Sequence, residues 1–283
     1  MPVKQLKSFV WMLGTLLSFS LMAVGARELS DSLSVSQVLF IRNVIGLGIM
    51  LLIIALTGKW RDLRTSRFHT HLFRNVFHFA GQYCWFLGIA LLPLAKVFAL
   101  EFTVPIWTAI IAAVFLKEQL NPRKLLAILL GFLGVLIILG SNSIALDEGS
   151  KVVLLSAIFY AIAHTSTKAL SSTESPVVVL FYMCAIQLPI SFILSDTAWT
   201  STGAVEWLWL LVISITGLSA HYCMTNAMKH TEITLIVIMD FLRLPFIAFV
   251  GVLAYGEALQ ASLIVGALLM LLGNITANTK FKN

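Results

Sequence analysis

The sequence predicts an all-α membrane protein of ten transmembrane helices, arranged as two inverted five-helix repeats around a central cavity. Three observations support this prediction. Hydrophobic residues make up 59% of the 283-residue chain, and charged residues only 11%. Lysine and arginine gather in alternate connections between the apolar segments, and residues of the first half recur in the second at one constant offset.

The composition excludes a water-soluble domain. Soluble domains are about 45–50% apolar and about 25% charged, whereas this chain has a mean hydropathy of +0.95. The net charge of +6 does not indicate nucleic-acid binding, because the basic residues are spread between apolar segments and form no soluble basic face. Cys84, Cys184 and Cys223 each lie inside an apolar segment without a CxxC pair, which predicts buried thiols over a disulfide or a zinc site.

Ten segments are long enough to cross a bilayer, which takes about 20 mostly apolar residues. They cover residues 8–26, 36–57, 74–92, 94–116, 123–141, 151–170, 176–195, 206–227, 233–254 and 258–279. The first is similar to a signal peptide, but no cleavage site closes it clearly and further spans follow, so we expect a retained helix. The break between the third and fourth spans depends mainly on Leu92-Pro93-Leu94.

The positive charges predict the orientation. With the N-terminus in the cytoplasm, only Arg27, Lys96 and Lys151 lie in outer connections, and Arg42 and Arg243 lie within spans. The other fourteen are Lys4, Lys7, Lys59, Arg61, Arg64, Arg67, Arg74, Lys117, Arg123, Lys124, Lys168, Lys229, Lys280 and Lys282. Because lysine and arginine are enriched in cytoplasmic loops, we predict an even number of spans in a bacterial-type cytoplasmic (inner) membrane, with both termini cytoplasmic.

An internal repeat divides the chain into residues 1–141 and 151–279, with five spans each. A shift of 139 positions (101 to 240) places Glu101-Phe102 on Asp240-Phe241, Glu118 on Glu257 and Gly134 on Gly273. Pro105 and Pro245 match within one residue. Because five is odd, the second half enters the membrane from the opposite side, and inverted repeats of this kind place a binding site near the midplane between them.

Several stretches are similar to one known family. They are residues 37–43 (Gln-Val-Leu-Phe-Ile-Arg-Asn), 92–95 (Leu-Pro-Leu-Ala), 102–107, 116–118, 131–135, 239–246 and 255–257. On these residues the chain resembles the drug/metabolite transporter superfamily, in its ten-helix EamA branch. The resemblance implies a carrier of amino acids, nucleotides, vitamins or other metabolites without ATPase parts. The branch that shares Leu-Pro-Leu-Ala and Asp-x-x-Arg-Leu-Pro includes proteins labelled as S-adenosylmethionine or riboflavin carriers, although Glu101 replaces a small residue that many relatives carry.

Four charged residues lie inside predicted spans: Arg42, Glu101, Asp240 and Arg243. A charge at bilayer depth costs about 2.5–3.5 kcal/mol on insertion scales, so such residues face protein or a wet cavity. Asp240 and Arg243 are three positions apart and share a helix face. Either they form a local ion pair, or Arg243 binds an anionic group of a substrate and Asp240 a cation or a proton.

Glu101 holds the position in the first half that Asp240 holds in the second, and a proline follows each acid within five residues. The two acids are expected to converge near the centre, where a carboxylate could exchange protons during transport. The alternative is that Glu101 pairs with Arg42 or Lys96 and fixes packing. Each proline removes a backbone hydrogen bond and can kink its span, which frees backbone groups to line a cavity.

Other polar and aromatic residues in the spans complete the candidate site. Arg42 lies near one end of its span, so it either joins the site or extends to the outer interface. The predicted substrate-binding set is Glu101, Asp240, Arg243, Arg42, His78, Gln82, Trp107 and Tyr222. The polar members could instead join helices by hydrogen bonds, and the aromatic members could pack or lie at the lipid interface rather than stack on a substrate. The same alternatives apply to Tyr83, Trp85, Tyr160, His164, Gln187, His221 and Asn226.

Two further groups of residues have structural roles in the prediction. Glu118 and Glu257 end the fourth and ninth spans, and each is expected to be a polar stop bonded to the start of the next helix. Six glycines are expected at close helix contacts. They are Gly46, Gly48, Gly131, Gly134, Gly266 and Gly273.

No motif in the chain indicates catalysis or ATP-driven pumping. GxxxxGK[ST], HExxH and GxSxG are all missing, and the histidines are scattered. We therefore predict no cofactor, no metal and no enzyme activity. The expected function is a secondary carrier, with a small-molecule substrate, the lipid bilayer and a role for protons as its partners, and with a monomer and a homodimer both open. A membrane-embedded lipid-active enzyme and a non-transporting scaffold are the alternatives.

Overall fold

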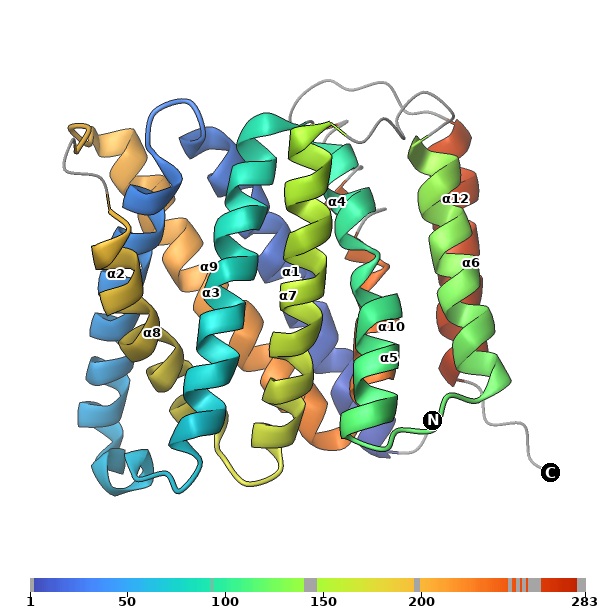
Figure 1. Ribbon diagram of the computed structural model, residues 1–283, viewed down its shortest axis with the longest axis horizontal. Helices are drawn as coiled ribbons and strands as arrows, with labels where there is room; N and C mark the ends of the chain where they lie inside the picture. Colours follow the sequence, from blue (N-terminus) through green and yellow to red (C-terminus); the bar gives the residue numbers. More distant parts are fainter. Residues whose placement is uncertain are drawn as a thin grey trace.

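Long apolar helices form the part of the protein that the computed structural model describes, namely residues 3–92, 94–139, 147–195, 199–243, 246–247, 250, 253 and 261–278. The helices are α1 (Val3–Leu29), α2 (Val35–Thr57), η1 (Lys59–Leu63), α3 (Phe68–Leu91), α4 (Leu94–Glu101), α5 (Val104–Phe115), α6 (Pro122–Leu139), α7 (Glu148–Ser171), α8 (Pro176–Ile193), α9 (Ala204–His230), α10 (Ile233–Asp240) and α12 (Ala261–Asn278). They run side by side in one bundle, and α1 begins at the same end at which α12 finishes (Figure 1).

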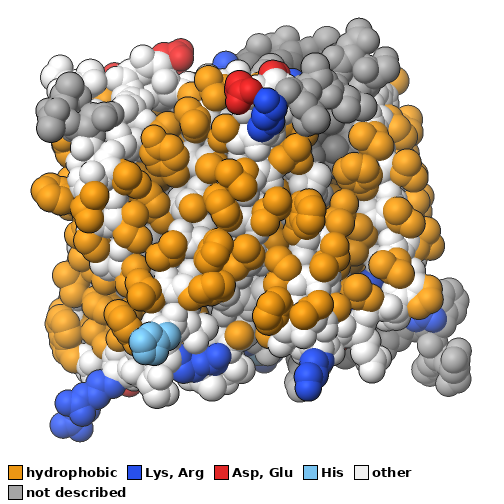
Figure 2. All heavy atoms as spheres, viewed as in Figure 1, with side chains coloured by type: hydrophobic (Ala, Val, Ile, Leu, Met, Phe, Trp, Pro, Cys, Tyr) orange, Lys and Arg blue, Asp and Glu red, His pale blue; other side chains and the backbone are white. Residues whose placement is uncertain are grey.

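The outer surface of the bundle is suited to lipid. In the described residues five helices are long and apolar enough to cross a membrane: Leu6–Leu29, Val35–Thr57, Glu148–Ser171, Pro176–Ile193 and Ala204–His230. Figure 2 shows hydrophobic side chains over most of the visible face, with charged side chains at its upper and lower edges and more of the lysine and arginine at the lower one. The chain is therefore an integral, multi-pass membrane protein.

The predicted span 94–116 is wrong as one continuous helix. It is two helices, because α4 ends at Glu101 and α5 begins at Val104. Pro105 has no N–H to donate to the carbonyl of Glu101 four residues earlier, so the α-helical ladder cannot continue through this point. The chain makes a turn at Phe102 and Thr103 instead.

The predicted span 233–254 is interrupted at the corresponding place. Helix α10 ends at Asp240, the next two residues form a turn, and Arg243 is helical again. The 139-residue offset maps this pattern onto the break after Glu101. Pro245 and residues 254–260, which include Glu257, lie outside the described residues.

Helix packing follows the order that a two-fold exchange of the halves requires. Helix α1 packs mainly against α9 and α3 against α7, while α2 packs on α8 and α6 on α12. In the proposed repeat α1 corresponds to α7, α3 to α9, α2 to α8 and α6 to α12. Exchanging the two halves therefore converts the α1–α9 contact into the α7–α3 contact. The same exchange leaves the α2–α8 and α6–α12 contacts unchanged.

Glycines bring α6 and α12 close together. A Cβ atom on Gly134 would lie 2.7 Å from the carbonyl oxygen of Gly266, and one on Gly273 would lie 2.9 Å from that of Ala127. The offset converts one contact into the other, since 134 maps to 273 and 127 to 266. A Cβ on Gly131 would lie 2.4 Å from the ring of Phe241, so this packing also supports the break after Asp240.

The prediction of close packing is confirmed for Gly46, whose Cβ would lie 3.0 Å from the sulfur of Cys184. It is wrong for Gly48, where nothing lies within 4 Å.

The pair Gly134 and Gly48 therefore gives a matched test. We expect Gly134→Ala to lower the free energy of unfolding by about 1–3 kcal/mol, because the methyl group meets backbone. Gly48→Ala should be neutral or stabilise by up to about 1 kcal/mol through backbone entropy. Unfolding in mixed micelles measures both, and equal effects would contradict this account of α6 and α12.

Helix α3 begins at Phe68, six residues before the predicted start of the third span at residue 74. Arg74, which the charge pattern assigned to a cytoplasmic connection, is consequently inside the bundle and only 1% exposed. Its Nε donates to Thr167 Oγ1 at 3.0 Å, and its Nη1 donates to Asn75 Oδ1 at 2.5 Å. The predicted position of Arg74 in a connection is wrong, because the basic residues that precede it give no sequence signal for the start of the helix.

Glu118 binds the other half of the protein instead of the next helix in sequence. Its Oε1 accepts from the N–H of Ile233 at 2.8 Å, and its Oε2 accepts from the hydroxyl of Thr234 at 2.7 Å. A carboxylate at a helix N-terminus satisfies free N–H groups and complements the helix dipole. Glu118 therefore fixes the start of α10, the helix that carries Asp240.

At the opposite end, Asp147 precedes α7 and joins it to α4. Its carboxylate accepts from Lys96 Nζ at 2.7 Å and from the N–H of Ser150 at 2.7 Å. The hydrogen bond from Lys96, followed by those from Ser150, lowers the pKa of Asp147 to about 2. This ion pair stays charged at any physiological pH, so it cannot account for a pH dependence of transport.

Candidate functional site

A small cavity lies among α1, α3, α4, α7, α9, the end of α10 and the segment that follows it. The space open to the centre of a water-sized sphere is about 20 Å³, which is room for one or two water molecules. Its walls are Phe19, Met22, Gln82, Trp85, Glu101, Tyr160, His164, His221, Asp240 and Arg243. Eight of these ten side chains carry nitrogen or oxygen, although the helices around them are mostly apolar.

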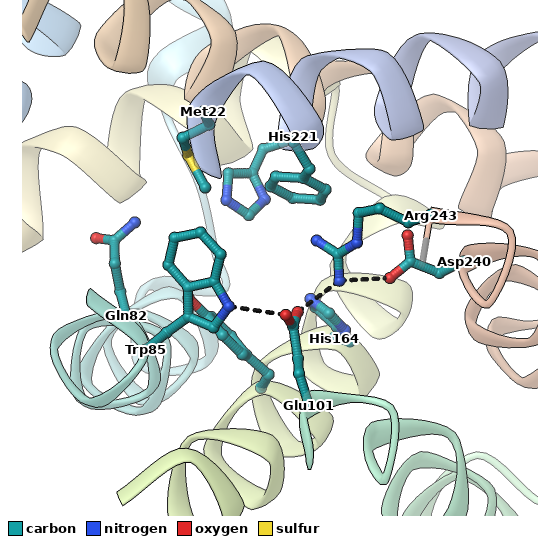
Figure 3. A pocket seen from close by; sticks show the side chains of 10 residues that line it. Met22, Gln82, Trp85, Glu101, His164, His221, Asp240 and Arg243 are labelled. Carbon is teal, nitrogen blue, oxygen red and sulfur yellow. Dashed lines mark hydrogen bonds and ion pairs between the residues drawn. The ribbon is translucent and has the colours of Figure 1, made fainter. Parts of the chain in front are cut away.

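Arg243 joins the two acids (Figure 3). Its Nη2 lies 2.5 Å from Glu101 Oε1 and 3.0 Å from Asp240 Oδ2. The other oxygen of Glu101 accepts a hydrogen bond of 2.7 Å from the indole nitrogen of Trp85. One guanidinium therefore pairs with both carboxylates, which end α4 and α10.

The helix breaks explain why this cluster needs a cation. Both acids are the last residues of short helices, where the helix dipole adds partial negative charge. Arg243 follows the break after Asp240, and its side chain points back toward the ends of α4 and α10. Aromatic rings of Phe19, Phe98 and Phe102 surround it, with their centres 5.2, 5.2 and 5.7 Å from Cζ, a distance at which cation–π attraction is favourable.

Histidines extend the polar wall of the cavity. His221 Nε2 lies 3.1 Å from Nε2 of His78, and Nδ1 of His78 lies 2.8 Å from the amide nitrogen of Gln187. His164 stacks on Tyr160, with ring centres 5.8 Å apart and planes 12° apart. The hydrogen bonds of His78 join α3, α8 and α9 beside the acid cluster, and its ring also meets that of Tyr160 on α7 edge-on, with ring centres 5.7 Å apart.

The structure brings four of the eight predicted site residues to the cavity: Glu101, Asp240, Arg243 and Gln82. His78 lies one hydrogen bond behind His221. Two buried oxygens of this set, Gln82 Oε1 and Asp240 Oδ1, have no hydrogen-bond partner among the described residues. Unsatisfied buried acceptors are costly, so they mark where water, a proton or a ligand would be stabilised.

Trp107 and Tyr222 lie away from the cavity, and each is 37% exposed. The buried face of α5 leaves Trp107 on the lipid side; its residues are Val104, Pro105, Thr108, Ala109 and Ala112. Tyr222 packs edge-on against Trp11 with ring centres 5.9 Å apart. These positions favour the alternative in which both residues pack or lie at the lipid interface.

Arg42 is buried at 4% exposure, so it does not extend to the outer interface. It also does not pair with Glu101, and Lys96 pairs with Asp147 instead. The local pair between Asp240 and Arg243 is present, but it shares its arginine with Glu101. The interpretation of Glu101 as a partner of Arg42 or Lys96 is therefore wrong.

Sequence reasoning did not place Phe19, Met22, Trp85, Tyr160, His164 or His221 in the candidate set. Phe19 and Met22 have no distinguishing signal, because they are two of many apolar residues on α1. Trp85 was one of several aromatic residues inside spans, and only its contact with Glu101 separates it from the others. The three remaining residues were noted as polar or aromatic but could not be assigned to one face of their helices.

The arrangement suits reversible binding better than catalysis. It offers two carboxylates, a guanidinium, imidazoles and aromatic faces, which together can hold a group that is charged at one part and flat at another. Within the described residues no cluster of three histidine, cysteine, aspartate or glutamate side chains could hold a metal ion. A membrane bundle with a charged interior of this kind is typical of a transporter.

Comparisons with known proteins agree with that class. The EamA-like transporter family matches residues 6–140 and again residues 148–279. A riboflavin transporter of Brucella anthropi is 31% identical over 82% of this chain and 86% of its own length. An S-adenosylmethionine uptake transporter of Rickettsia bellii is 24% identical over 92% and 89%, and a pseudopaline exporter of Pseudomonas aeruginosa is 29% identical over 91% of each. A solved crystal structure has the same fold, with a TM-score of 0.77, 17% identity and 96% coverage of both chains.

The chain belongs to the EamA-like transporter family. It is a membrane transporter of small metabolites rather than an enzyme.

Proposed function

We propose that the protein is a secondary transporter, which moves a small polar metabolite across the bacterial cytoplasmic membrane by alternating access. Its units are two inverted five-helix repeats, residues 1–141 and 151–279. The observation that carries the proposal is the network of Trp85, Glu101, Arg243 and Asp240 at two helix breaks that correspond under the 139-residue offset. Broken helices at the repeat interface are where such carriers bind substrate.

The substrate site includes Glu101, Asp240, Arg243 and Gln82 in this proposal, with Trp85 and His221 as neighbours. The cavity has room for only one or two water molecules, so this conformation is closed, and a metabolite enters when the helices around the breaks separate. Two acids that share one arginine leave about one net negative charge, which favours a substrate with a cationic group. An amino acid, a nucleoside-like compound and a vitamin with such a group all fit, and S-adenosylmethionine is a natural first probe.

The proposed orientation places both termini in the cytoplasm. The lower end of the bundle in Figure 1 holds the connections that run through η1, from α5 to α6, from α7 to α8 and from α9 to α10. Lys59, Arg61, Arg64, Arg67 and Lys117 lie in those connections, and Arg123 and Lys229 lie in the adjoining ends of α6 and α9. The rule that positive loops stay inside supports this end as the cytoplasmic one.

Cysteine labelling tests the orientation. In a variant without native cysteines, we expect a membrane-impermeant maleimide to label Ser201→Cys in intact cells, because Ser201 is exposed between α8 and α9. Ser172→Cys, exposed between α7 and α8 at the other end, should react only after permeabilisation. Labelling of Ser172→Cys in intact cells would reverse the proposed topology.

Proteoliposomes test the transport function itself. Purified protein should take up radiolabelled S-adenosylmethionine, riboflavin or an amino acid from a panel down a substrate gradient, and excess unlabelled substrate on the far side should accelerate exchange. An imposed pH gradient separates uniport and exchange from proton coupling. Failure to transport or to be thermally stabilised by any compound in the panel would favour a non-transporting role.

A further inference from the structure

Two arginines in the interior lack the acidic partner that Arg243 has. Arg42 on α2 is 4% exposed and Arg74 on α3 is 1% exposed. Each lies about 10 Å of helix from the start of its segment, at 1.5 Å per residue. Among the described residues, neither forms an ion pair. Two buried guanidinium groups without carboxylates are costly in a membrane protein and usually mark a functional site.

Within the residues that the structure describes, the hydrogen bonds of these arginines use only a few of their donors. Arg74 donates to the neutral oxygens of Thr167 and Asn75. Nε of Arg42 has no partner within the described part of the chain. A guanidinium has five N–H donors in a planar fork that matches a carboxylate or a phosphate, so the pair is equipped to bind an anion that the protein itself does not supply.

Small side chains make room for the guanidinium of Arg42. A Cβ on Gly217 would lie only 2.6 Å from its Nη2, so the group rests directly against the backbone of α9. Gly46, four residues further along the same face of α2, packs against α8, because a Cβ there would lie 3.0 Å from the sulfur of Cys184. Arg42 therefore extends inward between α8 and α9, toward the polar centre and away from lipid.

Polar contacts connect this region to the central cavity. His221 lines the cavity and meets His78 at 3.1 Å, and His78 meets Gln187 at 2.8 Å. Asn75, which accepts from Arg74, lies 3.5 Å from the same amide nitrogen of Gln187. Arg42 and Arg74 both act electrostatically on His78 and on His221. The arginine pair is thus the positive end of one continuous polar interior, whose negative end is the pair of acids.

We propose that Arg42 and Arg74 form a subsite that receives an anionic group, a carboxylate or a phosphate, of the transported metabolite. The inference rests on the proposed transport function and deepens it, since it assigns the substrate class. With Glu101 and Asp240 at the other end, the interior suits a metabolite that carries a cationic and an anionic group at separate positions. The anion enters as the helices open, and it supplies the counter-charge that the described residues lack.

Matched ligand pairs test the subsite on the purified full-length protein. The pairs are methionine with methioninamide, which differ in a carboxylate, and flavin mononucleotide with riboflavin, which differ in a phosphate. We expect the wild type to bind the anionic member of at least one pair about 10- to 100-fold more tightly, the range for hydrogen bonds to a charged group. The responding pair distinguishes carboxylate from phosphate.

Variants show whether the arginines cause that preference. Arg42→Gln and Arg74→Gln should each bring the two affinities within about threefold, whereas Arg67→Gln should keep the wild-type ratio. Arg67 is a matched control because it donates to the carbonyl of Ala169 and to Thr173, at the end of α7 and outside the interior. Gly217→Ala should also reduce the preference, because its methyl group displaces the Arg42 guanidinium without removing the charge.

Thermal melting separates binding from packing. Because Arg42 has no acidic partner to leave behind, we expect Arg42→Gln to melt at or above the wild-type temperature. Equal binding of both members of every pair by the wild type would overturn the subsite and leave the transport function intact. The same conclusion follows if Arg42→Gln and Gly217→Ala retain the wild-type preference. A protein that responds to no compound, charged or neutral, would contradict the transport function and the subsite together.

Discussion

Replacement of Arg243 by alanine is expected to abolish transport and to lower the free energy of unfolding by about 3–5 kcal/mol. Arg243 is the only described cation within 4 Å of the carboxylates of Glu101 and Asp240. Without it, two negative charges at the ends of α4 and α10 would face each other in the interior. Breaking a buried ion pair from one side is costly because the remaining charge keeps its desolvation penalty.

A charge-neutral combination separates the stability effect from the transport effect. Glu101→Gln, Asp240→Asn and Arg243→Met together remove all three charges, and buried ion groups replaced as a set are often neutral for stability or even stabilising. We expect this triple variant to regain most of the unfolding free energy lost by Arg243→Ala and to remain inactive. Unfolding in mixed micelles and uptake into proteoliposomes measure the two effects. Normal uptake by the triple variant would show that the cluster only holds the helices together.

The acid cluster shows how much of the site was visible in the sequence. Charged residues in apolar spans are rare, so Glu101, Asp240 and Arg243 could be selected from one sequence, and the 139-residue offset indicated that the two acids correspond. The offset could not show that a single arginine serves both acids. That contact depends on the turns after Glu101 and Asp240. In the sequence, Pro105 indicates a kink after Glu101 but does not show that the helix ends there.

Most of the remaining errors share one physical origin. A span that is apolar on every side has no visible period, so its buried face cannot be read from sequence. Trp85 and Trp107 both lie inside apolar predicted spans, and the sequence does not distinguish them. In the structure Trp85 on α3 faces Glu101, whereas Trp107 on α5 faces lipid. The same limit applies to Phe19 on α1. The prediction for Arg74 is wrong for another reason. Helix α3 begins inside the basic segment, so Arg74 lies in the interior and not in a connection.

The two acids are expected to differ in their effect on transport. Both oxygens of Glu101 are engaged, one by Trp85 and one by Arg243, whereas Asp240 has one engaged oxygen and one without a partner in the described residues. Glu101→Gln removes the charge from the more connected group, and hydrogen bonds to charged groups contribute about 1.5–3 kcal/mol. We therefore expect a fall in uptake rate of about 10- to 100-fold, with a smaller fall for Asp240→Asn.

The pH profile of uptake between pH 6 and 8 tests whether either acid carries protons. If Asp240, which has the unpartnered oxygen, exchanges protons with each cycle, Asp240→Asn should flatten the profile, while Glu101→Gln should lower the rate and retain the shape. Glu118→Gln is the matched control, because Glu118 binds the start of α10 outside the cavity. It should reduce stability and leave the profile unchanged. Wild-type rates and an unchanged profile in both cavity variants would remove the acids from the transport site, because a carboxylate that binds substrate cannot be neutralised without a change in rate.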